Sequence, residues 1–148
     1  MIRRHGEPPL RGRRYRRRPG AYGVVLHPRG ILLTLQTGEP VELQLPGGGI
    51  DPGEGAGQAL AREALEETGW QVRPIRRIGA YRRFTYMPDY GYHAEKIAHV
   101  FLARAVRRRG PPLEPAHEAV LLSPAEALAL LPVEGDREML ARAVGARR

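Results

Sequence analysis

The order of hydrophobic and polar positions predicts a chain built mainly from β-strands. Residues 21–27 and 31–36 are rich in β-branched and aliphatic side chains, and Pro28-Arg29-Gly30 separates them, which predicts a hairpin. Further strands are expected at 41–45, 72–86 (as one strand or two), 97–106 and 119–122. A polar and aromatic loop is expected at 87–96.

Three further segments carry helix signals. Residues 55–68 form the first, and Gly69 follows as a stop signal. The sequence Ser123-Pro124-Ala125-Glu126 is a strong helix start, because Ser caps the helix, Pro takes the first position and Glu completes a capping box. A third helix is expected at 135–144. Strands at both ends of the core with a helix between them predict a mixed α/β or α+β sandwich.

Three glutamates share one face of the helix expected at 55–68. At about 100° per residue, Glu63, Glu66 and Glu67 fall within an arc of about 100°. Apolar residues of the same segment fall on the other side, where they can pack on a sheet. Like charges three and four residues apart repel, and a divalent cation such as Mg²⁺ or Mn²⁺ would reverse that cost. A solvated acidic face is the alternative that these residues alone leave open.

The surroundings of these glutamates resemble a known motif. Gly48 is followed after five residues by Glu54, and after seven more by Arg-Glu-Ala-Leu-Glu-Glu-Thr-Gly-Trp at 62–70. This pattern is similar to the Nudix box, G-x5-E-x7-R-E-U-x-E-E-x-G-U, in which U is a bulky apolar residue, and every fixed letter matches. Ala64 is small for its U position, and Asp51 stands where the family usually has Glu.

The resemblance to Nudix hydrolases implies an α/β/α sandwich with a mixed β-sheet. It implies Mg²⁺-dependent (or Mn²⁺-dependent) hydrolysis of a pyrophosphate bond in a nucleoside diphosphate linked to another moiety, X. By the family pattern, Glu63 and Glu67 are the principal metal ligands, Glu66 is an auxiliary one, and the carbonyl of Gly47 joins them. The residues expected to have a structural role within the box are Gly48, Glu54, Arg62 and Gly69.

The resemblance leaves the general base open among carboxylates inside and after the box. Glu118 directly precedes the strand expected at 119–122, where several branches of the family carry a Glu that acts as the general base or binds metal. Glu114 and Glu95 are the alternatives, and an ordinary surface acid is the other interpretation of Glu118.

Substrate contacts are expected from the segment after the box. Arg82 and Arg83 are candidates for the phosphates, because a guanidinium is a permanently charged fork. Tyr86 lies at about the distance past the box at which the dinucleoside polyphosphate branch carries a Tyr, where its ring could stack on a base. Pro88 lies near the position of a Pro in the ADP-ribose branch, so an ADP-ribose-type pyrophosphatase is an alternative. The other interpretation of Arg82, Arg83 and Tyr86 is that they are ordinary strand residues without a role in binding.

Positive charge is concentrated at the start of the chain. Residues 1–18 carry eight arginines against Glu7 and are expected to form a basic, flexible arm before a Nudix hydrolase domain at 19–148. Such an arm could contact RNA, so an RNA 5′-end pyrophosphohydrolase is a further alternative. A non-catalytic nucleotide-binding regulator of the same fold is another, although such modules usually lose box glutamates that this chain keeps.

Composition excludes several other classes. The chain has no Cys, which rules out disulfides, thiolate metal sites and thiol catalysis, and by the resemblance the isomerases of the superfamily. No apolar run approaches the roughly 20 residues of a membrane helix, and the first residues lack the apolar segment of a secretory signal. A cytoplasmic location is therefore expected, with the protein either a monomer or a homodimer.

Overall fold

The computed structural model describes residues 2–145, which form an eight-stranded mixed sheet and three helices. In chain order the elements are β1 (Arg3–Arg4), β2 (Arg16–His27), β3 (Gly30–Gln36), β4 (Glu42–Gln44), β5 (Gly47–Gly49), α1 (Ala56–Thr68), β6 (Trp70–Met87), β7 (Tyr92–Arg108), β8 (His117–Leu122), α2 (Pro124–Leu130) and α3 (Glu134–Gly145). Within this part of the chain, each helix falls short of the length and apolar character that crossing a bilayer requires.

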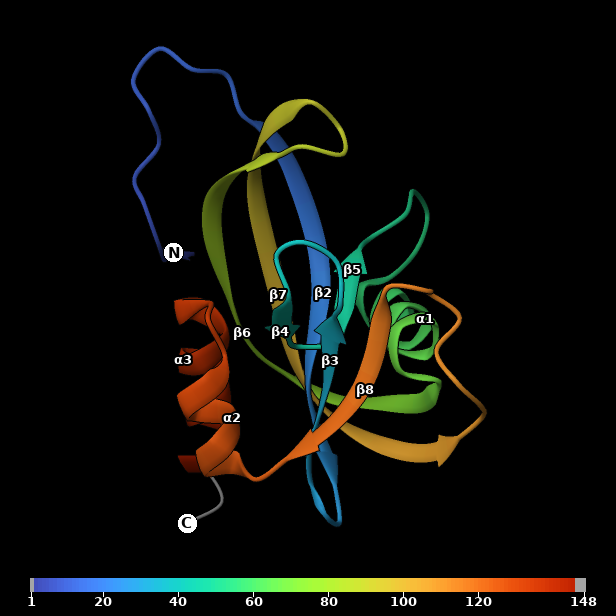
Figure 1. Cartoon of the computed structure of the whole chain (residues 1–148). Helices are drawn as coiled ribbons and strands as arrows, with labels where there is room; N and C mark the ends of the chain where they lie inside the picture. Colours follow the sequence, from blue (N-terminus) through green and yellow to red (C-terminus); the bar gives the residue numbers. More distant parts are fainter. Residues whose placement is uncertain (1, 146–148) are drawn as a thin grey trace.

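The sheet lies between two helical layers, so the predicted α/β/α sandwich is confirmed. Its strands follow the order β1-β6-β7-β2-β3-β4, with β5 added beside β2 and β8 beside β3. The β2–β7 pair is parallel and the β6–β7 pair is antiparallel, which makes the sheet mixed. Figure 1 shows α1 on one side of the sheet, and α2 and α3 on the other.

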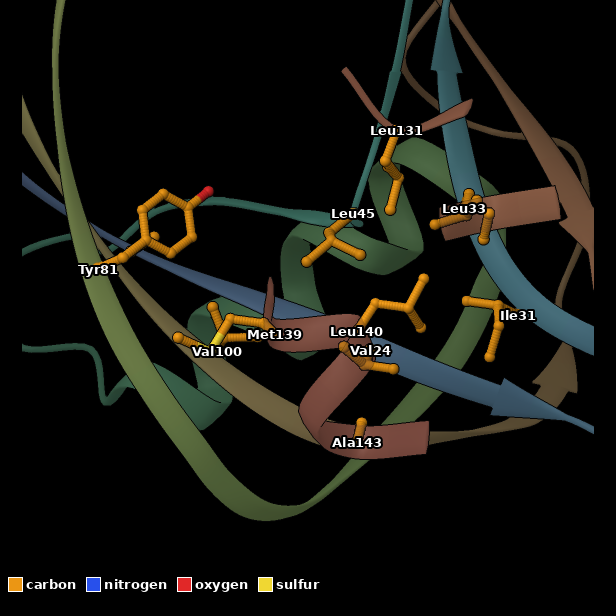
Figure 2. Packing of buried hydrophobic residues seen from close by; sticks show 12 residues of the cluster. Val24, Ile31, Leu33, Leu45, Tyr81, Val100, Leu131, Met139, Leu140 and Ala143 are labelled. Carbon is orange, nitrogen blue, oxygen red and sulfur yellow. The ribbon is translucent and has the colours of Figure 1, made fainter. Parts of the chain in front are cut away.

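Two buried clusters hold these layers together. Small side chains of α1 pack on one face of the sheet, where the buried residues include Ala21, Val25, Leu32, Ala59, Leu60, Ala64, Val72 and Ala103. On the opposite face, α3 inserts Met139, Leu140 and Ala143 between strand residues such as Val24 and Val100. Figure 2 shows this second cluster, with Tyr81 at its edge. Ala64, small for its place in the box, is fully buried against the sheet.

The ends of α1 and α2 agree with the sequence prediction. Gly69 adopts a left-handed conformation with φ of 75°, and its N–H donates to the carbonyl of Leu65 over 2.9 Å. A Cβ there would meet the carbonyl oxygen of Gly110, so glycine is needed both for conformation and for space. At α2, the N–H of Glu126 donates to Ser123 Oγ over 3.1 Å and the N–H of Ser123 donates to Glu126 Oε1 over 2.9 Å, which is the expected capping box.

Strand β2 changes partner along its length. Val25–His27 pair with β3, whereas Gly20–Tyr22 pair with the glycines of β5. The sheet therefore splits where β3 leaves β2 and β5 takes its place. This split places Gly47–Gly49 directly beside α1.

The N-terminal segment is more closely tied to the sheet than its composition predicts. Arg16–Arg18 form the first residues of β2 and pair with Ala94–Lys96 of β7, so the expected boundary between residues 18 and 19 falls inside a strand. Arg3–Arg4 pair with β6, and His5 is buried between Tyr81 and α3. Composition missed these pairings because strand hydrogen bonds come from the backbone, whatever the side chain.

The β6–β7 hairpin is longer than predicted. Residues 70–87 form one strand with local register shifts, and β7 begins at Tyr92, so the loop expected at 87–96 is reduced to a short turn. The polar and aromatic residues of the expected loop continue the two strands, because cross-strand pairing through Met87 and Tyr92 satisfies their backbone groups.

Candidate active site

Helix α1 directs two glutamates at the glycine strand β5. Glu67 is only 7% exposed, and its Oε1 accepts a 2.9 Å hydrogen bond from the N–H of Gly47. Glu63 lies against Gly48, where a Cβ would stand 2.8 Å from both carboxylate oxygens. The glycines of the box thus leave the space that these carboxylates occupy.

Arg62 joins the loop before α1 to the helix. Its Nε donates to Glu54 Oε2 over 2.8 Å and its Nη2 to Glu54 Oε1 over 2.9 Å, a two-pronged pair. The same guanidinium donates to Glu63 Oε1 and to the carbonyl of Gly49, each over 3.0 Å. The hydrogen bonds from Arg62 and from the backbone lower the pKa of Glu54 to about 2. These contacts support the structural role expected of Glu54 and Arg62.

The buried glutamates resist ionisation when no cation is bound. Burial raises the pKa of Glu67 to about 8 against the Gly47 hydrogen bond, and the neighbouring Glu63, Glu114 and Glu66 raise it further. Burial also raises the pKa of Glu63. Burial and like charges therefore act together, and added positive charge would favour the ionised forms.

The donor chemistry of this cluster fits a hard divalent cation. Carboxylate oxygens are the ligands that Mg²⁺ and Mn²⁺ prefer. Glu63, Glu66 and Glu67 lie close enough for their charges to interact, although within residues 2–145 no three such side chains converge on a single point. Arg62 takes part of this space, since its Nη1 is 3.0 Å from Glu63 Oε1 and 3.7 Å from Glu66 Oε2.

A cleft of about 330 Å³ extends from these glutamates to the N-terminal end of α3. Gly47–Gly49, Glu63 and Glu67 line one part of it, and Lys96, Arg83 and Asp136 line another. Tyr22 also lines the cleft, and burial together with the charges of Asp136, Glu67 and Glu63 raises the pKa of its hydroxyl.

Of the side chains proposed to contact substrate, the structure brings Arg83 into the cleft but not Arg82 or Tyr86. The ion pair of Arg82 with Glu95, at 3.4 Å, lies away from the cleft lining. Tyr86 is 51% exposed and packs on His93, with ring centroids 4.8 Å apart. Alternation along β6 explains this division, because successive residues of a strand point to opposite faces.

The three candidates for the general base differ in their surroundings. Glu118 is exposed on β8 and is absent from the cleft lining, whereas its neighbour His117 points inward, with Nδ1 2.8 Å from Thr34 Oγ1 and Nε2 4.0 Å from Glu67 Oε2. Glu95 is paired with Arg17 and Arg82. Glu114 is also exposed and outside the cleft lining, but its charge raises the pKa of both Glu63 and Glu67.

Several cleft residues escaped the sequence analysis, namely Arg18, Tyr22, Lys96, His117 and Asp136. They come from four different elements, so no spacing along the chain connects them. The one sequence feature that could have indicated a cleft residue is that Lys96 is the single lysine of the chain.

Comparison with known proteins gives a consistent picture. A family model described as the NUDIX domain matches residues 16–143. A putative 8-oxo-dGTP diphosphatase of Bacillus subtilis is 41% identical over 64 residues, which are 43% of each chain. An RNA pyrophosphohydrolase of Cronobacter sakazakii is 34% identical over 67 residues, 45% of this chain and 38% of that protein. The matches thus span less than half the length of these curated relatives.

The fold recurs in solved structures. A NUDIX hydrolase from Nitrosomonas europaea superposes with a TM-score of 0.71 at 22% identity, over 90% of this chain and 92% of that one. The family match covers most of the sheet, the box, α1, α2 and most of α3. The protein therefore belongs to the Nudix family.

Proposed function

We propose that the protein is a divalent-metal-dependent pyrophosphohydrolase that acts on a nucleoside diphosphate linked to another group. The observation that carries this proposal is the position of Glu67. It is a buried carboxylate at the wall of a cleft, held by the Gly47 amide beside Glu63, and burial raises its pKa to about 8. Because ionisation of this buried carboxyl group is unfavourable by itself, a bound cation would stabilise its charged form.

In this proposal Glu63 and Glu67 hold Mg²⁺ or Mn²⁺, and Glu66 assists them. A bound Mg²⁺ would lower the pKa of a water molecule and neutralise charge on the phosphates. The Gly47 amide orients Glu67, and Arg62 orients Glu63. Among the candidate bases Glu114 has the best-supported position, since its charge acts on both principal glutamates. The same position would also allow Glu114 to assist the cation.

Several nucleotide substrates, which differ in the group X, are candidates for the proposed reaction. Tyr86 was the residue that favoured a dinucleoside polyphosphate, and it lies outside the cleft lining, so it no longer supports that choice. Tyr22 and Tyr90 line the cleft and offer rings for a base. An ADP-ribose-type pyrophosphatase stays among the candidates.

RNA 5′ ends form a second candidate substrate, favoured by two pairs of arginine and tyrosine, of which Arg18 and Tyr90 line the cleft. Arg18 stacks over the Tyr90 ring at 4.5 Å, and Arg16 stacks over Tyr92 at 4.6 Å. Interleaved arginines and aromatic rings suit unstacked bases of single-stranded RNA. One relative that matches the chain in part is named an RNA pyrophosphohydrolase.

A substrate panel with phosphate detection tests the proposal. The panel contains nucleoside triphosphates, ADP-ribose, dinucleoside polyphosphates and triphosphorylated RNA, each with Mg²⁺ and with EDTA. Glu67→Gln should reduce turnover at least about 100-fold on the preferred substrate, as expected for loss of a catalytic metal contact. The exposed Glu7→Gln is the control. A wild-type protein that binds nucleotides but cleaves none would instead support the non-catalytic regulator.

A further inference from the structure

Three basic side chains lie in one row across three adjacent strands of the cleft. In the sheet register, Arg83 of β6 is opposite Lys96 of β7, and Lys96 is opposite Arg18 of β2. Directly opposite residues point to the same face of a sheet. All three line the cleft and are partly buried.

This row, Arg18–Lys96–Arg83, is poorly neutralised by the protein. The side chains of Lys96 and Arg83 make no hydrogen bond or ion pair with any residue of the described chain. Arg18 has neutral partners, donating to the hydroxyl of Tyr92 over 2.7 Å and stacking on Tyr90.

Asp136 and Glu42 are the acids of the cleft lining whose charges act on Lys96, and Asp136 is already engaged. Its Oδ1 accepts a 2.5 Å hydrogen bond from the hydroxyl of Tyr81, and burial raises its pKa to about 6. Three cations therefore face two carboxyl groups, and the buried one resists ionisation. Like charges directly opposite each other on neighbouring strands are destabilising, and burial adds to the cost.

The row begins beside the box and leads away from it. Gly20 of β2 pairs with Gly49 of β5, and Nη2 of Arg18 would be 3.4 Å from a Cβ on Gly49. From Arg18 the row crosses β7 and reaches Arg83 on β6, away from the glycine strand and α1. Anionic groups that extend from the glutamate end of the cleft would therefore meet these cations in turn.

We propose that the row Arg18–Lys96–Arg83 binds a further phosphate of the substrate, beyond the pyrophosphate that reacts at the glutamates. The inference rests on the proposed function and narrows it. The preferred substrate carries a chain of three or more phosphates. A substrate whose X group is an uncharged sugar would leave the charges of the row unneutralised. Two guanidinium forks and an ammonium group match the oxygens of a phosphate chain.

Metal-free binding tests the row independently of hydrolysis. Inorganic tripolyphosphate is titrated into the protein in EDTA and followed by calorimetry. Lys96→Met and Arg83→Gln should each weaken binding about tenfold, the loss expected for one charge-assisted contact. Arg76→Gln is the matched control, because Arg76 is exposed on the same strand as Arg83 and lies outside the cleft lining. Equal affinity of wild type and both row variants would overturn the inference.

Thermal unfolding separates loss of function from loss of fold. Lys96→Met removes a partly buried charge that faces two like charges, so its melting temperature should equal or exceed that of the wild type while its affinity falls. A melting temperature below that of the wild type would show that the protein itself neutralises Lys96, which contradicts the proposal.

Kinetics with Mg²⁺ distinguish the two proposals. Lys96→Met should raise KM about tenfold for a nucleoside triphosphate and change KM for a nucleoside diphosphate sugar less than about twofold. Glu67→Gln should reduce turnover of both substrates at least about 100-fold and keep metal-free tripolyphosphate binding. If the wild type cleaves neither substrate but the row variants still lose tripolyphosphate, the proposed function fails and only polyphosphate binding by the row stands. If hydrolysis proceeds and the KM values rise equally for both substrates or for neither, the row fails alone.

Discussion

Gly48 faces the carboxylate of Glu63 so closely that a Cβ at this glycine would lie 2.8 Å from both carboxylate oxygens. The glycine of the box is therefore explained by space rather than by backbone conformation, since Gly48 is not among the glycines with positive φ. Glu63 lies in its present position because residue 48 has no side chain.

Gly48→Ala should displace Glu63 with little loss of fold. A displacement of about 1 Å at a catalytic group reduces activity by about 100-fold, and we expect a loss of this order in kcat with a melting temperature near that of the wild type. Gly110→Ala is the control, because a Cβ there meets nothing within 4 Å and the backbone is free of positive φ. Full activity of Gly48→Ala would show that Glu63 tolerates another position.

Glu67→Gln should stabilise the metal-free protein near pH 8 although it removes activity. The folded-state pKa of Glu67 is raised from 4.5 to about 8, so the protonated form contributes stability that is present below about pH 4.5 and is lost as pH rises through 8. The glutamine side chain of the variant keeps an oxygen for the Gly47 amide and carries no charge. Between about pH 5 and about pH 9 in EDTA, the melting temperature should therefore fall less steeply with rising pH for the variant than for the wild type. An equal pH dependence of the two melting temperatures would contradict this prediction.

Arg62→Lys should lower kcat while the charge is conserved. A single ammonium group cannot reproduce the two-pronged pair with Glu54 and at the same time reach Glu63 and the Gly49 carbonyl. Loss of a residue that orients a metal ligand costs about 10- to 100-fold. The measurement is kcat across a Mg²⁺ titration, with the exposed Arg73→Lys as control; complete recovery at high Mg²⁺ would restrict the role of Arg62 to metal affinity.

Deletion of residues 1–18 should lower the melting temperature by about 5 °C or more. The deletion removes β1, the buried His5 and the first three residues of β2, which pair with β7. The double variant Arg11→Gln/Arg14→Gln removes charge from the exposed part of the same segment and should melt close to the wild type. An unchanged melting temperature after the deletion would support the freely flexible arm that composition alone favours.

The sequence by itself determined those features that depend on neighbours along the chain. The arc of Glu63, Glu66 and Glu67, the stop at Gly69 and the start at Ser123 all follow from local geometry, and the structure contains each of them. The spacing from Gly48 to Trp70 also determined the family, because a loop and one helix carry the whole motif.

Tertiary structure decided which face of a strand each side chain occupies and which strands are neighbours. Arg82 and Arg83 have the same local sequence signal, but alternation along β6 places only Arg83 in the cleft. Residues 18, 83 and 96 lie far apart in the chain and meet because β2, β7 and β6 are adjacent in the sheet. Strand order and register arise from packing between distant segments, so they, and the substrate end of the cleft with them, follow from the folded sheet and not from spacing along the chain.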